Sequence, residues 1–195
     1  MTRAAVLLVH GGREVGTGPV RRLDLPVLRM DLFRLSIRRA LWRHDVEVRQ
    51  VRFTQQGWNG TGESALGDLR RAIDDFALGT DAKIVLVGHS MGGRASMRMA
   101  EHPAVSGIVG LAPWLPDDEM LVDVRGQQIR VAHGSADRTT RPDASLDFVE
   151  RARAAGADAS HVLVPGEGHA LLRQRRWWDR FIIESVLGIL GTHTS

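Results

Sequence analysis

The segment Gly-His-Ser-Met-Gly at positions 88–92 constrains this chain more than any other. Residues 83–87 before it are mostly apolar and β-branched, which predicts a buried strand, and residues 93–100 after it predict a helix. Between a strand and a helix, this pattern makes a tight turn that strains the serine backbone and exposes its hydroxyl group. The free N–H groups at the start of the helix add positive potential beside that hydroxyl. Ser90 is therefore predicted to be a nucleophile.

Two later segments supply the acid and the base that a nucleophilic serine needs. Residues 128–133 predict a strand that leads to Asp137, and residues 160–164 predict a strand that leads to His169. In a parallel sheet the carboxyl ends of the strands lie on one edge, so these side chains can converge on Ser90. Asp137 is expected to orient His169, and His169 is expected to take the proton of the serine.

Other residues compete for these roles. Asp117 or Asp118, which follow an earlier predicted strand, are alternative candidates for the acid. The chain contains eight histidines, of which His89 and His133 lie in or beside tight turns and are expected to brace loops. His169 is preferred as the base because it combines a position after a late strand with a glycine-rich loop.

A turn made of His10 and two glycines follows the first predicted strand. Such a turn lets a backbone N–H group point at the carbonyl oxygen of a substrate. Either Gly12 or Arg13 is expected to be the first donor, and the sequence leaves this choice open. With the N–H group of Met91, that donor would form an oxyanion hole.

The length of 195 residues predicts a single domain, spanning residues 1–195, that alternates strands with helices. This alternation is typical of an α/β fold, here a three-layer α/β/α sandwich with a mainly parallel sheet of about six strands. The expected strands are 5–9, 46–53, 83–88, 106–111, 128–133 and 160–164. The expected helices lie near 26–43, 63–78, 91–101, 142–155 and 176–190.

Taken in order, these motifs resemble those of the α/β-hydrolase family over nearly the whole chain. The resemblance implies an eight-stranded sheet flanked by helices, and an acyl-enzyme mechanism on esters, thioesters, amides or related carbonyl compounds. The chain departs from the family in starting at the strand before the oxyanion turn, so we expect the two leading strands to be missing. It also lacks a long insertion after residues 105–111, where many members carry a lid. We therefore expect a minimal α/β-hydrolase fold without a lid domain.

The motifs predict a serine hydrolase that cleaves small carboxylic ester or thioester substrates through an acyl-enzyme intermediate. Alternatives are C–C bond hydrolysis, dienelactone-type hydrolysis or cofactor-free perhydrolysis, or a non-catalytic ligand-binding protein on the same scaffold. Trp58 and Trp114 lie in loops that should border the cleft. Each is expected either to form a wall of the substrate pocket or to fill the core beneath its loop.

The charge and the residue composition of the chain limit the kinds of partner that it can bind. The net charge is only +3, and the arginines are scattered among acidic residues, which argues against nucleic-acid binding. The histidines lack metal-ligand spacing, the chain has no cysteine, and no cofactor motif is present, so neither a metal nor a cofactor is expected. No apolar run is long enough to span a membrane. We expect a cytoplasmic protein with a small-molecule substrate, and the sequence leaves the oligomeric state open.

Overall fold

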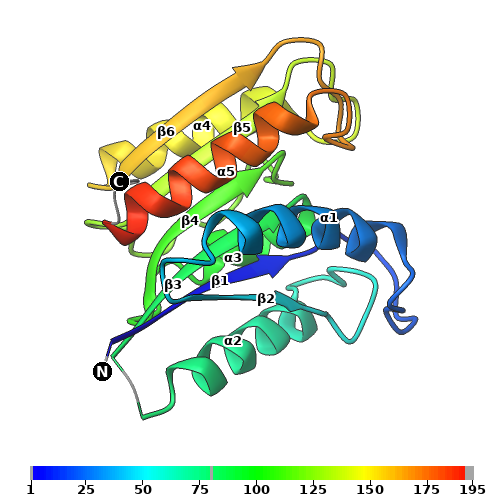
Figure 1. Ribbon diagram of the computed structural model, residues 1–195. Helices are drawn as coiled ribbons and strands as arrows, with labels where there is room; N and C mark the ends of the chain where they lie inside the picture. Colours follow the sequence, from blue (N-terminus) through cyan, green and yellow to red (C-terminus); the bar gives the residue numbers. More distant parts are fainter. Residues whose placement is uncertain (1, 80, 192–195) are drawn as a thin grey trace.

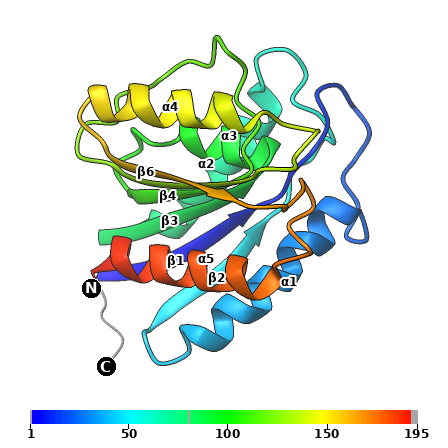
Figure 2. The same ribbon diagram turned by 90° about the horizontal axis from the view of Figure 1, so that it is seen from above.

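The computed structural model describes residues 2–79 and 81–191 as three layers, with helices on both faces of one sheet (Figures 1 and 2). The strands are β1 (Thr2–Val9), β2 (Val46–Val51), β3 (Asp81–His89), β4 (Val105–Leu111), β5 (Gln128–Gly134) and β6 (Asp158–Val164). The helices are α1 (Leu25–Ala40), α2 (Glu63–Ala77), α3 (Met91–Arg98), α4 (Pro142–Ala154) and α5 (Arg175–Leu190). The predicted α/β sandwich is confirmed.

Two helices end three residues earlier than the sequence predicts. Helix α1 ends at Ala40 because residues 41–45 turn into β2, with Asp45 in the left-handed region at φ 50°. Helix α3 ends at Arg98, a few residues before Pro103. A proline disfavours helical backbone at the preceding residue and cannot donate a helical hydrogen bond, so the chain turns toward β4 instead.

All six strands are parallel and lie in the order β2-β1-β3-β4-β5-β6. Because the strands are parallel, the loops that follow β1, β3, β5 and β6 emerge on the same edge of the sheet. These four loops carry the predicted oxyanion turn, nucleophile, acid and base, respectively. The topology alone therefore gathers segments that are far apart in the sequence.

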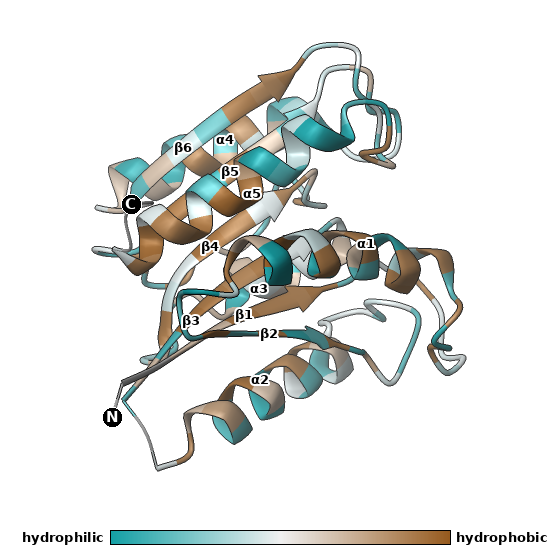
Figure 3. Cartoon of the chain, viewed as in Figure 1, coloured by the Kyte–Doolittle hydropathy of each residue, from teal (hydrophilic) through white to brown (hydrophobic). Residues whose placement is uncertain are grey.

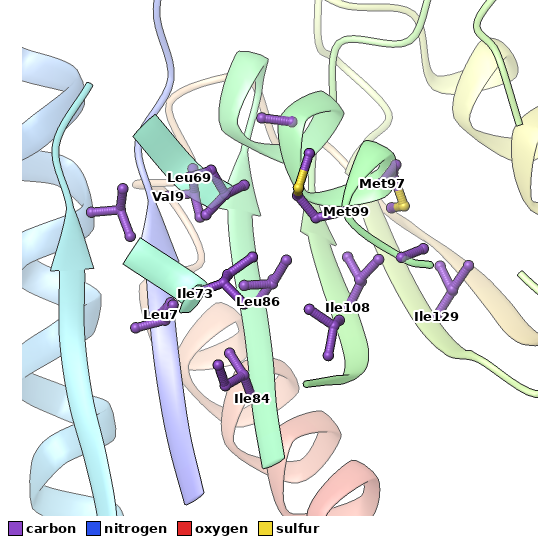
Figure 4. Close-up of a cluster of buried hydrophobic side chains, with 14 of the residues drawn as sticks. Leu7, Val9, Leu69, Ile73, Ile84, Leu86, Met97, Met99, Ile108 and Ile129 are labelled. Carbon is purple, nitrogen blue, oxygen red and sulfur yellow. The ribbon is translucent and has the colours of Figure 1, made fainter. Parts of the chain in front are cut away.

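Each face of the sheet has its own hydrophobic core. Helices α2, α3 and α4 cover one face, and α1 and α5 cover the other (Figure 2). On the first face, Leu69 and Ile73 of α2 lie over Leu7 and Val9 of β1 (Figure 4). Burial of the apolar side of each helix is the main force that holds the layers together, and it fixes the central strands that end at the functional loops.

The connection between β4 and β5, residues 112–127, contains no helix or strand. The described part of the chain therefore has no lid at this position, as the sequence predicts. In the same described part, none of the helices has the length and apolar character needed to cross a membrane.

Two histidines are buried as neutral groups near the carboxyl edge of the sheet. His10 donates from Nδ1 to the carbonyl oxygen of Gly11 at 2.6 Å and accepts at Nε2 from the N–H group of Phe53 at 3.1 Å. His89 donates from Nε2 to the carbonyl oxygen of His169 at 2.9 Å. Burial lowers the pKa of His10, and it lowers the pKa of His89 well below the usual value. Neither imidazole can be protonated without placing a charge in an apolar environment.

These two histidines make the stability of the fold sensitive to mild acid. Below about pH 6.5 the unfolded chain binds protons that the folded chain excludes, so the free energy of unfolding decreases as the pH falls. Each histidine contributes a slope of up to ~1.4 kcal/mol per pH unit, measurable by urea denaturation between about pH 5 and pH 8. His10→Gln removes one of these imidazoles and should reduce the slope. A free energy of unfolding that stays constant below pH 6.5 would show that the folded chain protonates both imidazoles as readily as the unfolded chain does.

Candidate active site

The turn between β3 and α3 holds Ser90 in a backbone conformation that residues other than glycine rarely adopt, with φ 56° and ψ −120°. The flanking glycines make this turn possible. A Cβ atom on Gly88 would lie 2.4 Å from the carbonyl oxygen of Gly92, and one on Gly92 would lie 2.3 Å from that of Val9. The segment is therefore a nucleophile elbow, packed backbone to backbone against the end of β1, with the serine at the start of a helix.

The three residues that the sequence predicts as nucleophile, base and acid lie within hydrogen-bonding distance of one another. The Oγ atom of Ser90 is 3.1 Å from Nε2 of His169. The Nδ1 atom of His169 is 2.8 Å from Oδ2 of Asp137. Because a carboxylate only accepts, Nδ1 carries the proton and Nε2 is free to accept from the serine hydroxyl. This is the arrangement that a serine nucleophile requires.

The Asp137 side chain is fully buried and accepts five hydrogen bonds. The donors are the imidazoles of His133 and His169, the hydroxyl of Thr140, and the backbone amides of Thr139 and Thr140. Burial alone would raise the pKa of this carboxyl, but the hydrogen bonds from the two histidines and the two amides outweigh it and lower the pKa far below the usual range. Asp137 is therefore ionised throughout the neutral range.

Asp117, the alternative acid, lies elsewhere. Its carboxylate is largely exposed and forms an ion pair with Arg141 at 2.8 Å. In the geometry of the site, Asp137 and not Asp117 contacts the imidazole of His169.

The second imidazole on Asp137 belongs to His133, which was expected only to brace a loop. Its Nε2 atom is 3.1 Å from Oδ2 of Asp137, and its Nδ1 atom is 2.6 Å from the hydroxyl of Ser145 on α4. A neutral imidazole fits this arrangement when Ser145 donates to Nδ1 and Nε2 donates to the carboxylate. In the sequence, the sign of a contact between His133 and the acid is their spacing of four residues, from the end of β5 to Asp137.

Two further buried residues hold the loop that carries His169. His89, next to the nucleophile, donates to the carbonyl oxygen of His169, which confirms the predicted bracing role. The carboxylate of Glu167 accepts from the amides of Gly168 and Gln174 and from the indole N–H of Trp178. This carboxylate ties the loop to the first turn of α5. Sequence reasoning missed Glu167, although an acidic residue inside a glycine-rich loop is a possible signal.

The backbone contacts of Arg13 bear on the choice between the two expected oxyanion donors. The amide of Arg13 donates to the carbonyl oxygen of Gln56 at 2.8 Å, where residues 13 and 57 form a β-bridge. The Arg13 amide is therefore committed to the loop after β2 and is not free to bind a substrate. Gly12 remains the candidate, and a Cβ atom there would lie 2.5 Å from the Met91 side chain. Pairing between the two loops engages the amide of Arg13, which favours Gly12 among the two expected donors.

The two tryptophans expected at the cleft pack against each other instead. Their rings meet edge to face at 6.3 Å, and the guanidinium of Arg94 lies over both, 4.2 Å from Trp58 and 4.7 Å from Trp114. Arg94 also pairs with the buried carboxylate of Glu119. Trp58 is only 2% exposed, so it fills the core beneath its loop, which was the other expectation. The cation on α3 lies over both aromatic rings and stabilises their packing.

A cavity of about 290 Å³ borders the oxyanion turn, residues 10–13. The turn itself forms one wall, from His10 to Arg13. The opposite wall comes from the loop between β1 and α1 and from the start of α1, with Val20, Asp24, Leu25, Pro26 and Val27. Apolar and small polar groups therefore meet next to Gly12, whose amide donates to no acceptor among the described residues.

Comparisons with known proteins agree with this geometry. The alpha/beta hydrolase family matches residues 6–161 of the chain. No curated protein matches the sequence. Among solved structures, the chain is similar to Est1E from Butyrivibrio proteoclasticus, with 15% identity and a TM-score of 0.67 over 98% of this chain and 90% of that one.

Two further solved structures share the fold. One is a monoacylglycerol lipase from Paleococcus ferrophilus, with 16% identity and a TM-score of 0.63 over 95% of this chain and 94% of that one. The other is the esterase Pf2001 from Pyrococcus furiosus, with 14% identity and a TM-score of 0.67 over 96% of this chain and 81% of that one. With the sequence match over most of its length and the elbow at Ser90, the chain belongs to the alpha/beta hydrolase family.

Proposed function

We propose that this protein is a serine hydrolase that cleaves small carboxylic ester or thioester substrates. The observation that carries the proposal is the unbroken set of hydrogen bonds from Ser90 through His169 to a buried, ionised Asp137. Membership of a hydrolase family supports hydrolysis in general. Among proteins of similar fold, two are named as an esterase and a monoacylglycerol lipase, which favours ester bonds.

The proposed mechanism assigns each step to one group. The Ser90 hydroxyl attacks the carbonyl carbon of the substrate while Nε2 of His169 accepts its proton. Asp137 holds the imidazole in the required tautomer and stabilises the imidazolium. The amides of Gly12 and Met91 bind the oxyanion, and His169 then protonates the leaving group. Water then gives a proton to His169 and adds to the acyl carbon. His169 returns the proton to Oγ of Ser90 as the bond to the acyl group breaks and the acid leaves.

The size of the cavity beside Gly12 favours a small substrate. Its volume of about 290 Å³ is at the lower limit of the range for small-molecule pockets. The apolar groups Leu25, Pro26 and Val27 supply one wall of it. With no lid between β4 and β5, a long acyl chain would extend into water and gain little from each added methylene.

Removal of the nucleophile is the first test. Ser90→Ala should lower kcat on p-nitrophenyl acetate by about 10⁴-fold or more, because the remaining groups cannot form an acyl-enzyme. Labelling by a fluorophosphonate probe should be lost as well. Ser64→Ala, which changes a hydroxyl at the start of α2, should retain both activity and labelling. Wild-type activity in Ser90→Ala would exclude the proposed mechanism.

The acid can be tested by comparing two aspartates. Asp137→Asn should decrease kcat by roughly 10⁴-fold, since an amide cannot hold the imidazole in the required tautomer or stabilise its charge. Asp117→Asn removes a carboxylate from an exposed ion pair and should change kcat less than about twofold. Steady-state kinetics with both variants test this assignment. A larger loss of kcat in Asp117→Asn than in Asp137→Asn would assign the acid to Asp117.

His133 should act as a positioning residue for this acid. His133→Phe removes one donor to the Asp137 carboxylate, so we expect kcat to fall about tenfold or more with little change in KM, because His133 does not line the cavity. His133→Gln can still donate at a similar position and should restore most of the loss. A thermal melt separates this role from a structural one. If both variants lose thermal stability equally and their folded fraction keeps the kcat of the wild type, His133 only supports the fold.

A further inference from the structure

A second cavity, of about 530 Å³, lies between α1 and the edge strand β2. Its walls come from the loop before α1, from α1 itself, and from the second half of β2 with the residue after it. They are lined by Arg22, Val27, Asp31, Arg34, Val48, Arg49, Gln50 and Arg52. We call this hollow the arginine cavity, because four arginines line it against one carboxylate. Figure 3 shows hydrophilic, teal residues along β2, beside the brown β1.

Two of the four arginines have partners within the chain. The guanidinium of Arg49 pairs with Glu47 and lies 5.5 Å from the ring of Phe76, a residue of α2 on the other face of the sheet. The Nε atom of Arg34 donates to Asp31 at 2.7 Å. This pair neutralises the carboxylate of the cavity, and the other N–H groups of Arg34 have no acceptor among the described residues.

The other two, Arg22 and Arg52, form no ion pair and no side-chain hydrogen bond in the part of the chain that the structure describes. Arg22 precedes α1 and Arg52 follows β2, so they belong to opposite walls. The two walls are tied together where Nε2 of Gln50 donates to the carbonyl oxygen of Val27 at 3.0 Å. Both charges therefore lie at the same end of the cavity, and an anion placed there would be attracted by both.

The arginine cavity adjoins the cavity beside the oxyanion turn, since Val27 lines both. Phe53, which directly follows Arg52, donates its amide to Nε2 of His10 in that turn. The nearer cavity has one charge of each sign, from Arg13 and Asp24 among its lining residues. The surplus of positive charge is therefore confined to the arginine cavity.

The register of the sheet gives the distance from the elbow. Val9 at the end of β1 pairs with Val51 on one side and with Gly88 on the other. With neighbouring strands about 4.8 Å apart, the end of β2 lies about 10 Å from the end of β3, where the elbow begins. A group held in the arginine cavity can therefore belong to the same small molecule as a carbonyl group at Ser90.

We propose that the arginine cavity binds a phosphate group of the ester or thioester substrate whose carbonyl group lies at Ser90. This inference rests on the proposed function. Arginine matches phosphate oxygens with paired N–H groups, and a phosphate monoester carries about −1.5 to −2 charges at pH 7, as two unpaired guanidinium groups require. A carboxylate, with a single charge, would neutralise only one of them.

The distance also limits how the phosphate is attached. An extended chain covers roughly 3.5 Å for every three bonds, so a span of about 10 Å needs about eight bonds or more between the carbonyl carbon and the phosphorus. We therefore expect a phosphate at the end of a flexible chain, not one directly beside the ester. The chain can belong to the leaving part of the substrate or to its acyl part, and the kinetic test separates the two.

Direct binding tests the cavity without any catalysis. Octyl phosphate should bind the wild type and Ser90→Ala alike, with a Kd below about 1 mM by calorimetry. Arg22→Gln and Arg52→Gln should each weaken binding roughly fivefold or more, because each removes charge-assisted hydrogen bonds to the phosphate. Arg43→Gln, which changes an exposed arginine outside the cavity in the turn after α1, is the matched control and should bind like the wild type. Absence of binding at 1 mM, or equal binding by the wild type and all three arginine variants, would overturn the proposal.

Kinetics with two pairs of substrates show which part carries the phosphate. The first pair is 8-hydroxyoctyl acetate and its phosphate ester, with the phosphate on the leaving part. The second is methyl 8-hydroxyoctanoate and its phosphate ester, with the phosphate on the acyl part. In one of the two pairs, the phosphorylated member should have a kcat/KM about tenfold higher or more, mainly through KM, and Arg52→Gln should reduce this preference while Arg43→Gln keeps it.

The outcomes separate this inference from the proposed function. Equal kcat/KM values within both pairs would refute a phosphate site for the substrate and leave the serine hydrolase intact. If octyl phosphate binds through Arg22 and Arg52 but no ester is cleaved and Ser90 is not labelled by a fluorophosphonate, the anion site is supported and the proposed hydrolysis is wrong.

Discussion

The close approach of the β3–α3 turn to the end of β1 is the constraint on which the site depends. Gly92 lies so near the carbonyl oxygen of Val9 that no side chain could stand between them. This contact places the start of α3 beside the oxyanion turn, so that a Cβ atom on Gly12 would meet the Met91 side chain and one on Gly11 would lie 3.2 Å from Cβ of Ser90. If the elbow moved away from β1, the nucleophile would separate from that turn.

Buried histidines hold much of the remaining framework. His10 joins the end of β1 to the chain after β2, His89 joins the elbow to the His169 loop, and His133 joins β5 and α4 to the acid. An imidazole suits these positions because it can donate at one nitrogen and accept at the other.

The sequence could predict what depends on local pattern. The strands and helices, the elbow at Ser90 and the order of Asp137 and His169 follow from periodicity, turn residues and the parallel sheet. It could not predict contacts between loops. The amide of Arg13 donates to the loop after β2, and the buried Trp58 packs against Arg94. Both outcomes depend on tertiary packing, because each joins residues more than thirty positions apart.

The hydrogen bond from His89 to the backbone of His169 has a consequence for fluctuations within the site. His89 precedes Ser90 directly, so the base is attached to the same strand end that carries the nucleophile. Thermal displacement of that strand end should carry both groups in the same direction. The spread of the Ser90–His169 separation should then be smaller than the mobility of either loop would suggest. Proton transfer is sensitive to that separation, so the site can keep its alignment even while its surroundings move.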